Sequence, residues 1–109
     1  MGMPMYGQSF TLDNPKNHGL NAPANQKGFA GPFTRVGGFL AFYEICEMIK
    51  TQGWTVDLDS QGRYGPYAYK GNQWVSFDDM AMIKYKADYI RKMGLGGGMV
   101  WALDLDDFR

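Results

Sequence analysis

Apolar side chains recur at helical spacing in two stretches of the chain. From Gly38 to Gly53 they return at steps of three and four residues, which is the spacing of one face of a helix. The second stretch follows Asp78 and Asp79, whose carboxylates suit the positive end of a helix dipole, and it stops at Gly94. The pattern therefore predicts two amphipathic helices, each ended by a glycine.

Between the two helices, apolar and polar residues alternate, as in half-buried strands. The alternation covers Trp54 to Leu58, Tyr64 to Tyr69 and Gln73 to Phe77, with turn residues between these segments. We expect three short antiparallel strands that form a meander. Its aromatic residues either fill the core of the meander or bind a ligand, and they are Trp54, Tyr67, Tyr69, Trp74 and Phe77.

The two ends of the chain have a different character. Met3 to Tyr6 is the end of a buried strand in this interpretation, and Met99 to Leu103 is continuously apolar, as in a parallel strand that is buried on both faces. Residues 13–38 are rich in Asn, Gly and Pro, which favours a long irregular connection. The sequence predicts an α+β fold, in which a meander is inserted between one barrel strand and the helix and strand that follow it.

Composition narrows the class of partner. Eleven basic and eleven acidic side chains give a net charge of zero, so there is no positive field to attract nucleic acid or anionic lipid. Binding of single-stranded nucleic acid by stacked aromatics is disfavoured too, because a basic groove is missing. No apolar run is long enough to span a membrane. Aromatic residues make up 16% of the chain, which suits a neutral ligand such as a sugar.

The sequence offers no convincing metal or cofactor site. The segment from Asp57 to Gly62 begins like a calcium loop, but Ala68 stands where the bidentate carboxylate belongs, so we expect a plain turn. His18 has no second histidine or cysteine pair to complete a zinc site and is expected in a loop. We therefore expect no metal and no cofactor.

Four residues invite a functional interpretation, each with an ordinary alternative. Asp104 and Asp106 follow the last apolar strand, and their spacing places them on one strand face. They are either a catalytic pair or acidic residues that are solvated where the strand ends. Trp101 is either a platform at a barrel mouth or core filling. Glu44, on the apolar side of the first helix, is either solvated at the helix edge or directed into a cleft.

Four blocks of sequence resemble the last quarter of family 18 chitinases, especially those of arthropods. The resemblance extends over essentially the whole chain, and the closing block is the most specific. The blocks are Met3 to Phe10, Gly37 to Glu44, Asn72 to Asp79 and Gly94 to Phe108.

The resemblance implies a (β/α)8 barrel with an α+β chitin-insertion domain after its seventh strand. On that basis residues 1–8 are the remnant of strand seven, residues 9–77 are the insertion domain, and residues 78–109 are helix seven and strand eight. The implied partners are chitin or N-acetylglucosamine oligomers and the remainder of the barrel. Self-association through the two barrel strands is a further expectation, because their edges would be open.

The resemblance also assigns substrate-binding residues. It implies that Trp101 floors the subsite of the reacting sugar, that Tyr6 contacts the same region and that Glu44 reaches into the cleft. Many relatives have Arg where this chain has Gln8; Gln can still hydrogen-bond a sugar, but it lacks the charge and the forked donor geometry of Arg.

No catalytic residue is assigned within the chain. The family's Asp-x-x-Asp-x-Asp-x-Glu run, whose Glu is the acid in a substrate-assisted retaining mechanism, does not occur in these residues. We therefore expect the chain by itself not to hydrolyse chitin, although the parent is expected to be a chitinase. The alternative is a non-catalytic chitinase-like lectin or carbohydrate-binding module.

The single cysteine, Cys46, is either a buried thiol or half of a disulfide. The resemblance implies that it pairs with a cysteine just beyond the Asp106-Asp107-Phe108 motif, in a parent that is secreted into an extracellular, oxidising setting.

Overall fold

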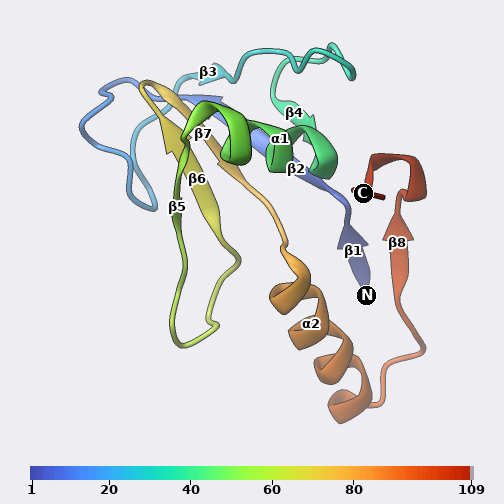
Figure 1. Cartoon of the computed structure of the whole chain (residues 1–109). Coiled ribbons are helices and arrows are strands. Elements are labelled where there is room, and N and C mark those ends of the chain that lie inside the picture. Colours follow the sequence, from blue (N-terminus) through green and yellow to red (C-terminus); the bar gives the residue numbers. More distant parts are fainter. Residues whose placement is uncertain (109) are drawn as a thin grey trace.

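The computed structural model describes residues 1–108, which form two sheets and two α-helices (Figure 1). The smaller sheet is a parallel pair, β1 (Gly2–Pro4) and β8 (Met99–Trp101). The larger sheet is antiparallel in the order β3-β2-β7-β6-β5, with β4 also paired to β2. Its strands are β2 (Tyr6–Thr11), β3 (Gln26–Lys27), β4 (Phe39–Ala41), β5 (Thr55–Asp57), β6 (Tyr67–Lys70) and β7 (Gln73–Ser76).

Strand β2 joins the two sheets. It begins only one residue after β1 ends, and it pairs with β3, β4 and β7. The expected three-strand meander β5-β6-β7 is present, but the expectation that Met3 to Tyr6 is one strand was incomplete. The chain bends at Met5 and continues as a strand of the other sheet. The partners of this strand are distant in the sequence, so local sequence patterns do not predict the pairing.

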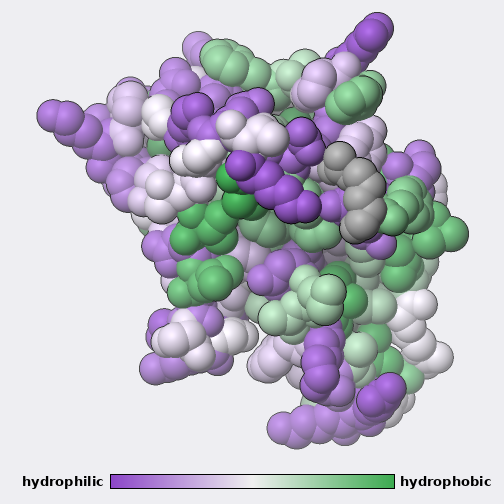
Figure 2. Space-filling model, in the orientation of Figure 1, coloured by the Kyte–Doolittle hydropathy of each residue, from purple (hydrophilic) through white to green (hydrophobic). Residues whose placement is uncertain are grey.

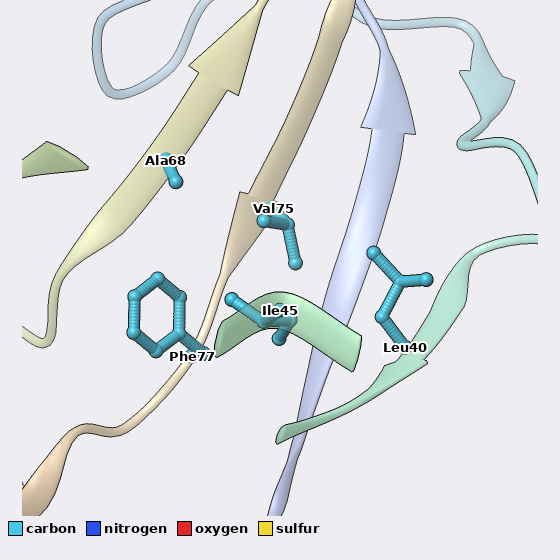
Figure 3. Packing of buried hydrophobic residues seen from close by; sticks show 5 residues of the cluster. All are labelled: Leu40, Ile45, Ala68, Val75 and Phe77. Atoms are coloured by element: carbon cyan, nitrogen blue, oxygen red, sulfur yellow. The ribbon is translucent and has the colours of Figure 1, made fainter. Parts of the chain in front are cut away.

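Helix α1 (Phe42–Gln52) covers one face of the larger sheet. The expected helix began at Gly38, but Phe39–Ala41 is strand β4, because these residues pair with β2. The core lies between α1 and the sheet, as Figure 3 shows. Its buried cluster comprises Leu40, Ile45, Ala68, Val75 and Phe77.

Helix α2 (Met80–Met93) matches the second predicted helix closely. The Asp79 side chain accepts a hydrogen bond from the backbone N–H of Met82, so it caps the helix as an N-terminal acidic residue should. Gly94 ends the helix in the left-handed conformation. No helix among residues 1–108 is both long and apolar enough to cross a membrane.

The other face of the larger sheet is aromatic. Trp74 stacks on Tyr67 with ring centroids 5.2 Å apart, and His18 stacks on Tyr69 at 3.8 Å. The indole N–H of Trp74 donates to the backbone carbonyl of His18, so the connection between β2 and β3 lies against this face. His18 is therefore a loop residue, as expected, and much of the aromatic set packs within the fold.

The segment that resembles a calcium loop is a plain turn. Both Asp59 carboxylate oxygens accept hydrogen bonds from Arg63, and this pairing lowers the pKa of Asp59 to about 2. Asp57 accepts from the hydroxyl of Tyr67, 2.8 Å away. Burial, together with this hydrogen bond, raises the pKa of Tyr67 to about 12.

Strand β8 differs from its expectation most clearly. We expected a strand buried on both faces, but all three of its residues are exposed. Within the described residues β8 pairs only with β1, so its apolar side chains have little to pack against. Figure 2 shows hydrophobic residues exposed at the edge of the molecule where β8 lies in Figure 1.

This difference between the sheets predicts unequal amide exchange. The amides of Met5 and Met99, which hydrogen-bond across the β1–β8 pair, should exchange at least about tenfold faster than those of Ala68 and Val75 in a dilute monomer. Hydrogen exchange followed by NMR measures the ratio. Equal protection of the two sheets in a sample shown by sedimentation to be monomeric would contradict the prediction.

Candidate functional site

Trp101 is the last residue of β8, and Tyr6 lies two residues beyond the end of the neighbouring parallel strand β1. Pro4 is in register with Trp101, and the backbone N–H of Met5 donates to the Trp101 carbonyl at 2.8 Å. Trp101 is 62% exposed, so it fills no core among the described residues. The peptide bond from Trp101 to Ala102 is cis.

Gln8 lies on the same side of β2 as Tyr6, because side chains two residues apart on a strand share a face. Both residues line a cavity of about 410 Å³ on the aromatic side of the larger sheet. Tyr6 is half-buried and stacks on Phe39, with ring centroids 5.1 Å apart. The structure therefore brings Tyr6 and Gln8 together in one cavity, which Trp101 does not line.

Glu44 is placed differently. Its side chain is only 2% exposed, so the alternative of a solvated residue at the helix edge is wrong. One carboxylate oxygen accepts from the Ala41 N–H at 2.9 Å and from the Thr34 hydroxyl at 2.8 Å. The other accepts from the backbone N–H groups of Phe33 at 3.0 Å and Thr34 at 3.2 Å. The carboxylate thus ties the start of α1 to the loop before β4.

This arrangement keeps Glu44 ionised. Burial raises the pKa of its carboxyl, but the four hydrogen bonds outweigh the burial and hold the pKa below its usual value. Gly31 packs directly against the carboxylate, where any side chain would overlap it. A residue that the sequence offered as a cleft contact is therefore also a structural anchor.

Asp104 and Asp106 do not share the strand face that the alternative of a catalytic pair requires. Asp104 lies in the short 3-10 helix η1 (Leu103–Leu105), and Asp106 follows that helix. Both residues line a second cavity, of about 790 Å³, together with Glu44. The candidate residues are thus divided: Tyr6 and Gln8 line one cavity, Glu44 lines the other, and Trp101 lines neither of these two.

Sequence reasoning missed two residues that shape the site. Phe39 supports the Tyr6 ring, and Thr34 donates twice to Glu44. Neither has a local signal: the Phe39 contact depends on the pairing of β4 with β2, and the Thr34 contacts depend on the loop before β4 folding back onto α1. Within residues 1–108, no three His, Cys, Asp or Glu side chains are grouped to hold a metal ion.

Comparison with known proteins identifies this arrangement. The family model described as glycosyl hydrolases family 18 matches residues 1–106. The chain belongs to glycosyl hydrolase family 18. The parallel pair β1–β8 beside an antiparallel sheet with two helices agrees with the α+β fold that the resemblance implied.

Individual relatives support the assignment. The chain is 62% identical over its whole length to a protein named probable chitinase 10 of Drosophila melanogaster, of which it covers 5%. It is 56% identical, with a TM-score of 0.94, to catalytic domain 2 of the group II chitinase of Ostrinia furnacalis in complex with (NAG)5. Human YKL-39, described as a pseudo-chitinase with retained chitooligosaccharide binding, is 45% identical with a TM-score of 0.86.

The chain spans only part of these relatives. It covers 28% of the Ostrinia furnacalis chain and 29% of the YKL-39 chain, while those alignments include 98% and 99% of its own residues. The match is therefore to one continuous part of a larger family 18 domain.

The Glu44 contacts predict a pH-dependent contribution to stability. In Glu44→Gln an amide NH2 replaces one oxygen and faces a backbone N–H, so the free energy of unfolding at pH 7 should fall by about 2 kcal/mol. The pKa of Glu44 is lower in the folded state than in the unfolded state. The contribution of ionised Glu44 to the free energy of unfolding is therefore present above the unfolded-state pKa and is lost as pH falls through the folded-state pKa. Urea unfolding at several values between pH 7 and pH 3 measures both effects.

Asp88→Asn is the matched control, since Asp88 is an exposed carboxylate on α2 with surface ion pairs only. Its effect should stay below about 1 kcal/mol. If Glu44→Gln were as stable as the wild type at pH 7, the anchoring role of Glu44 would be refuted.

Proposed function

We propose that this chain is the carboxy-terminal part of a family 18 chitinase that binds chitin oligomers and supplies one wall and part of the floor of the cleft. The observation that carries the proposal is Trp101, exposed at the end of β8, with Tyr6 two residues beyond the end of the paired strand β1. Tyr6 and Gln8 in turn line one cavity. A flat aromatic face takes the C–H face of a pyranose, while amide and hydroxyl groups bind its polar edge. The oligosaccharide complexes of relatives support this choice of ligand.

The proposal includes the organisation of the parent. Residues 1–8 and 78–109 belong to its barrel, residues 9–77 are its chitin-insertion domain, and the remainder of the barrel is the natural partner of β1 and β8. Exposure of β8 in the present chain supports that partnership and also favours self-association when the barrel is missing. The parent is extracellular in this proposal, with Cys46 in a disulfide.

Glu44 requires a more limited role than the resemblance suggested. Four internal donors already occupy its carboxylate, so in this proposal any contact with sugar is secondary to positioning the loop before β4. Hydrolysis is assigned to the parent, because no residue in this chain matches the catalytic Glu.

A second candidate is a non-catalytic chitinase-like lectin. Human YKL-39, described as a pseudo-chitinase with retained chitooligosaccharide binding, is 45% identical, but the chitinases of Drosophila melanogaster and Ostrinia furnacalis are 62% and 56% identical, so the enzyme is favoured. The two candidates share the binding surface and differ in the catalytic run of the parent. An intact Asp-x-x-Asp-x-Asp-x-Glu run in the parent reading frame decides for the enzyme.

The binding surface is tested by titration with chitotriose. We expect a dissociation constant near 1 mM, about 4 kcal/mol of binding free energy, because half a cleft desolvates a sugar poorly. Trp101→Ala should weaken binding about tenfold without changing the unfolding midpoint, since the ring is largely exposed.

Leu58→Ala is the control, because Leu58 has a similar exposure and lies beyond β5, far along the chain from the site. Micromolar binding that is indifferent to Trp101→Ala would refute the assignment of the floor.

A further inference from the structure

The connection between β2 and β3, residues 12–25, lies against the aromatic face of the larger sheet and has no assigned role; Figure 1 draws it as the blue loop between these strands. Trp74 of β7 is in register with Phe10 of β2. Phe10 shares its face of β2 with Tyr6 and Gln8, since side chains two residues apart on a strand point the same way. The connection therefore contacts the same face that carries two of the proposed sugar-binding residues.

Hydrogen bonds hold the two ends of this connection together. The backbone N–H of Asn25 donates to one carboxylate oxygen of Asp13 at 3.0 Å, and the Asn25 side-chain amide donates to the other at 2.6 Å. The backbone N–H of Asp13 donates to the carbonyl of Pro23 at 3.0 Å. These bonds fix the base of the connection, so the position of its tip depends on separate contacts made near His18.

His18 attaches the tip to the sheet at two points. Its ring stacks on Tyr69 of β6, with ring centroids 3.8 Å apart and an angle of 13° between the planes. Its backbone carbonyl accepts a hydrogen bond from the indole N–H of Trp74 at 3.1 Å. The indole has no other donor, so this bond fixes the orientation of the Trp74 ring. The stack in turn keeps the carbonyl of His18 in place.

Leu20, two residues after His18, is the point at which the connection meets the cavity of Tyr6 and Gln8. Leu20 and Trp74 both line that cavity, whose volume is about 410 Å³. Leu20 is 47% exposed, so burial of its own side chain does little to hold it there. Its place in the cavity wall depends instead on the attachment of the tip through His18.

We propose that His18 is a positioning residue for sugar binding in this cavity. By holding Trp74 and the tip of the connection, His18 keeps Leu20 in the wall of the space that Tyr6 and Gln8 line. His18 itself does not line the cavity and acts through its neighbours. A wall that is ordered before the ligand arrives lowers the entropic cost of binding. The proposal rests on the proposed function, in which Tyr6 and Gln8 bind the sugar.

Replacing the His18 ring tests this role. NMR titration with chitotriose gives the affinity of each variant, and exchange of the Trp74 indole N–H with water reports on the attachment. His18→Ala removes the stack, so it should weaken binding about threefold and speed indole exchange about tenfold. His18→Phe keeps a ring on Tyr69 and should match the wild type in both. Asn17→Ala is the control, because Asn17 is exposed and its side chain makes no hydrogen bond among the described residues.

The outcomes distinguish failure of this inference from failure of the proposed function. If Trp101→Ala weakens chitotriose binding but His18→Ala does not, the positioning role is refuted and the floor stands, whatever the rate of indole exchange. If His18→Phe weakens binding as much as His18→Ala does, the stack on Tyr69 is not what positions the wall, and the inference is again wrong. Absence of binding in the wild type overturns both proposals.

Discussion

The pairing of β2 with β4 and β7 is the interaction on which the rest of the structure depends. The chain leaves the parallel sheet after β1, bends at Met5 and continues as β2, an interior strand of the antiparallel sheet. Its alternation places Gly7 and Ser9 toward α1 and Tyr6 and Gln8 toward the opposite face. One strand therefore fixes the core, the direction of two proposed binding residues and the position of the sheet beside Trp101.

Local patterns were sufficient for features that depend on near neighbours. The spacing of apolar residues and the acidic start of α2 predicted that helix and its end at Gly94, because capping acts within a few residues. The meander β5-β6-β7 was predicted for the same reason. Strand β4 was not, because Phe39 to Ala41 continue the helical spacing of α1 and become a strand only by pairing with β2.

The site shows the same limit. The sequence and its resemblance selected Trp101, Tyr6, Gln8 and Glu44, but not what surrounds them. Glu44 is, as expected, a carboxylate on the apolar side of α1. Its four hydrogen-bond donors, however, belong to the loop before β4 and to the end of β4, and no local sequence pattern predicts that these segments lie against Glu44. The alternative of a catalytic pair needed Asp104 and Asp106 on one strand face, but β8 ends at Trp101 and Asp104 lies in η1, so they do not have this arrangement. Where a residue's environment is made by distant segments, its chemistry can be read only from the fold.

The central claim is that the surface at the carboxyl ends of β1 and β8 binds sugar. An NMR titration of the labelled chain with chitotriose tests it most directly, by mapping which resonances move. We expect the Trp101 indole N–H and the amides of Tyr6 and Gln8 to shift in a saturable manner, while the indole of Trp54, which does not line the cavity of Tyr6 and Gln8, stays nearly fixed. Saturable shifts that leave the Trp101 indole and Tyr6 unmoved would contradict it.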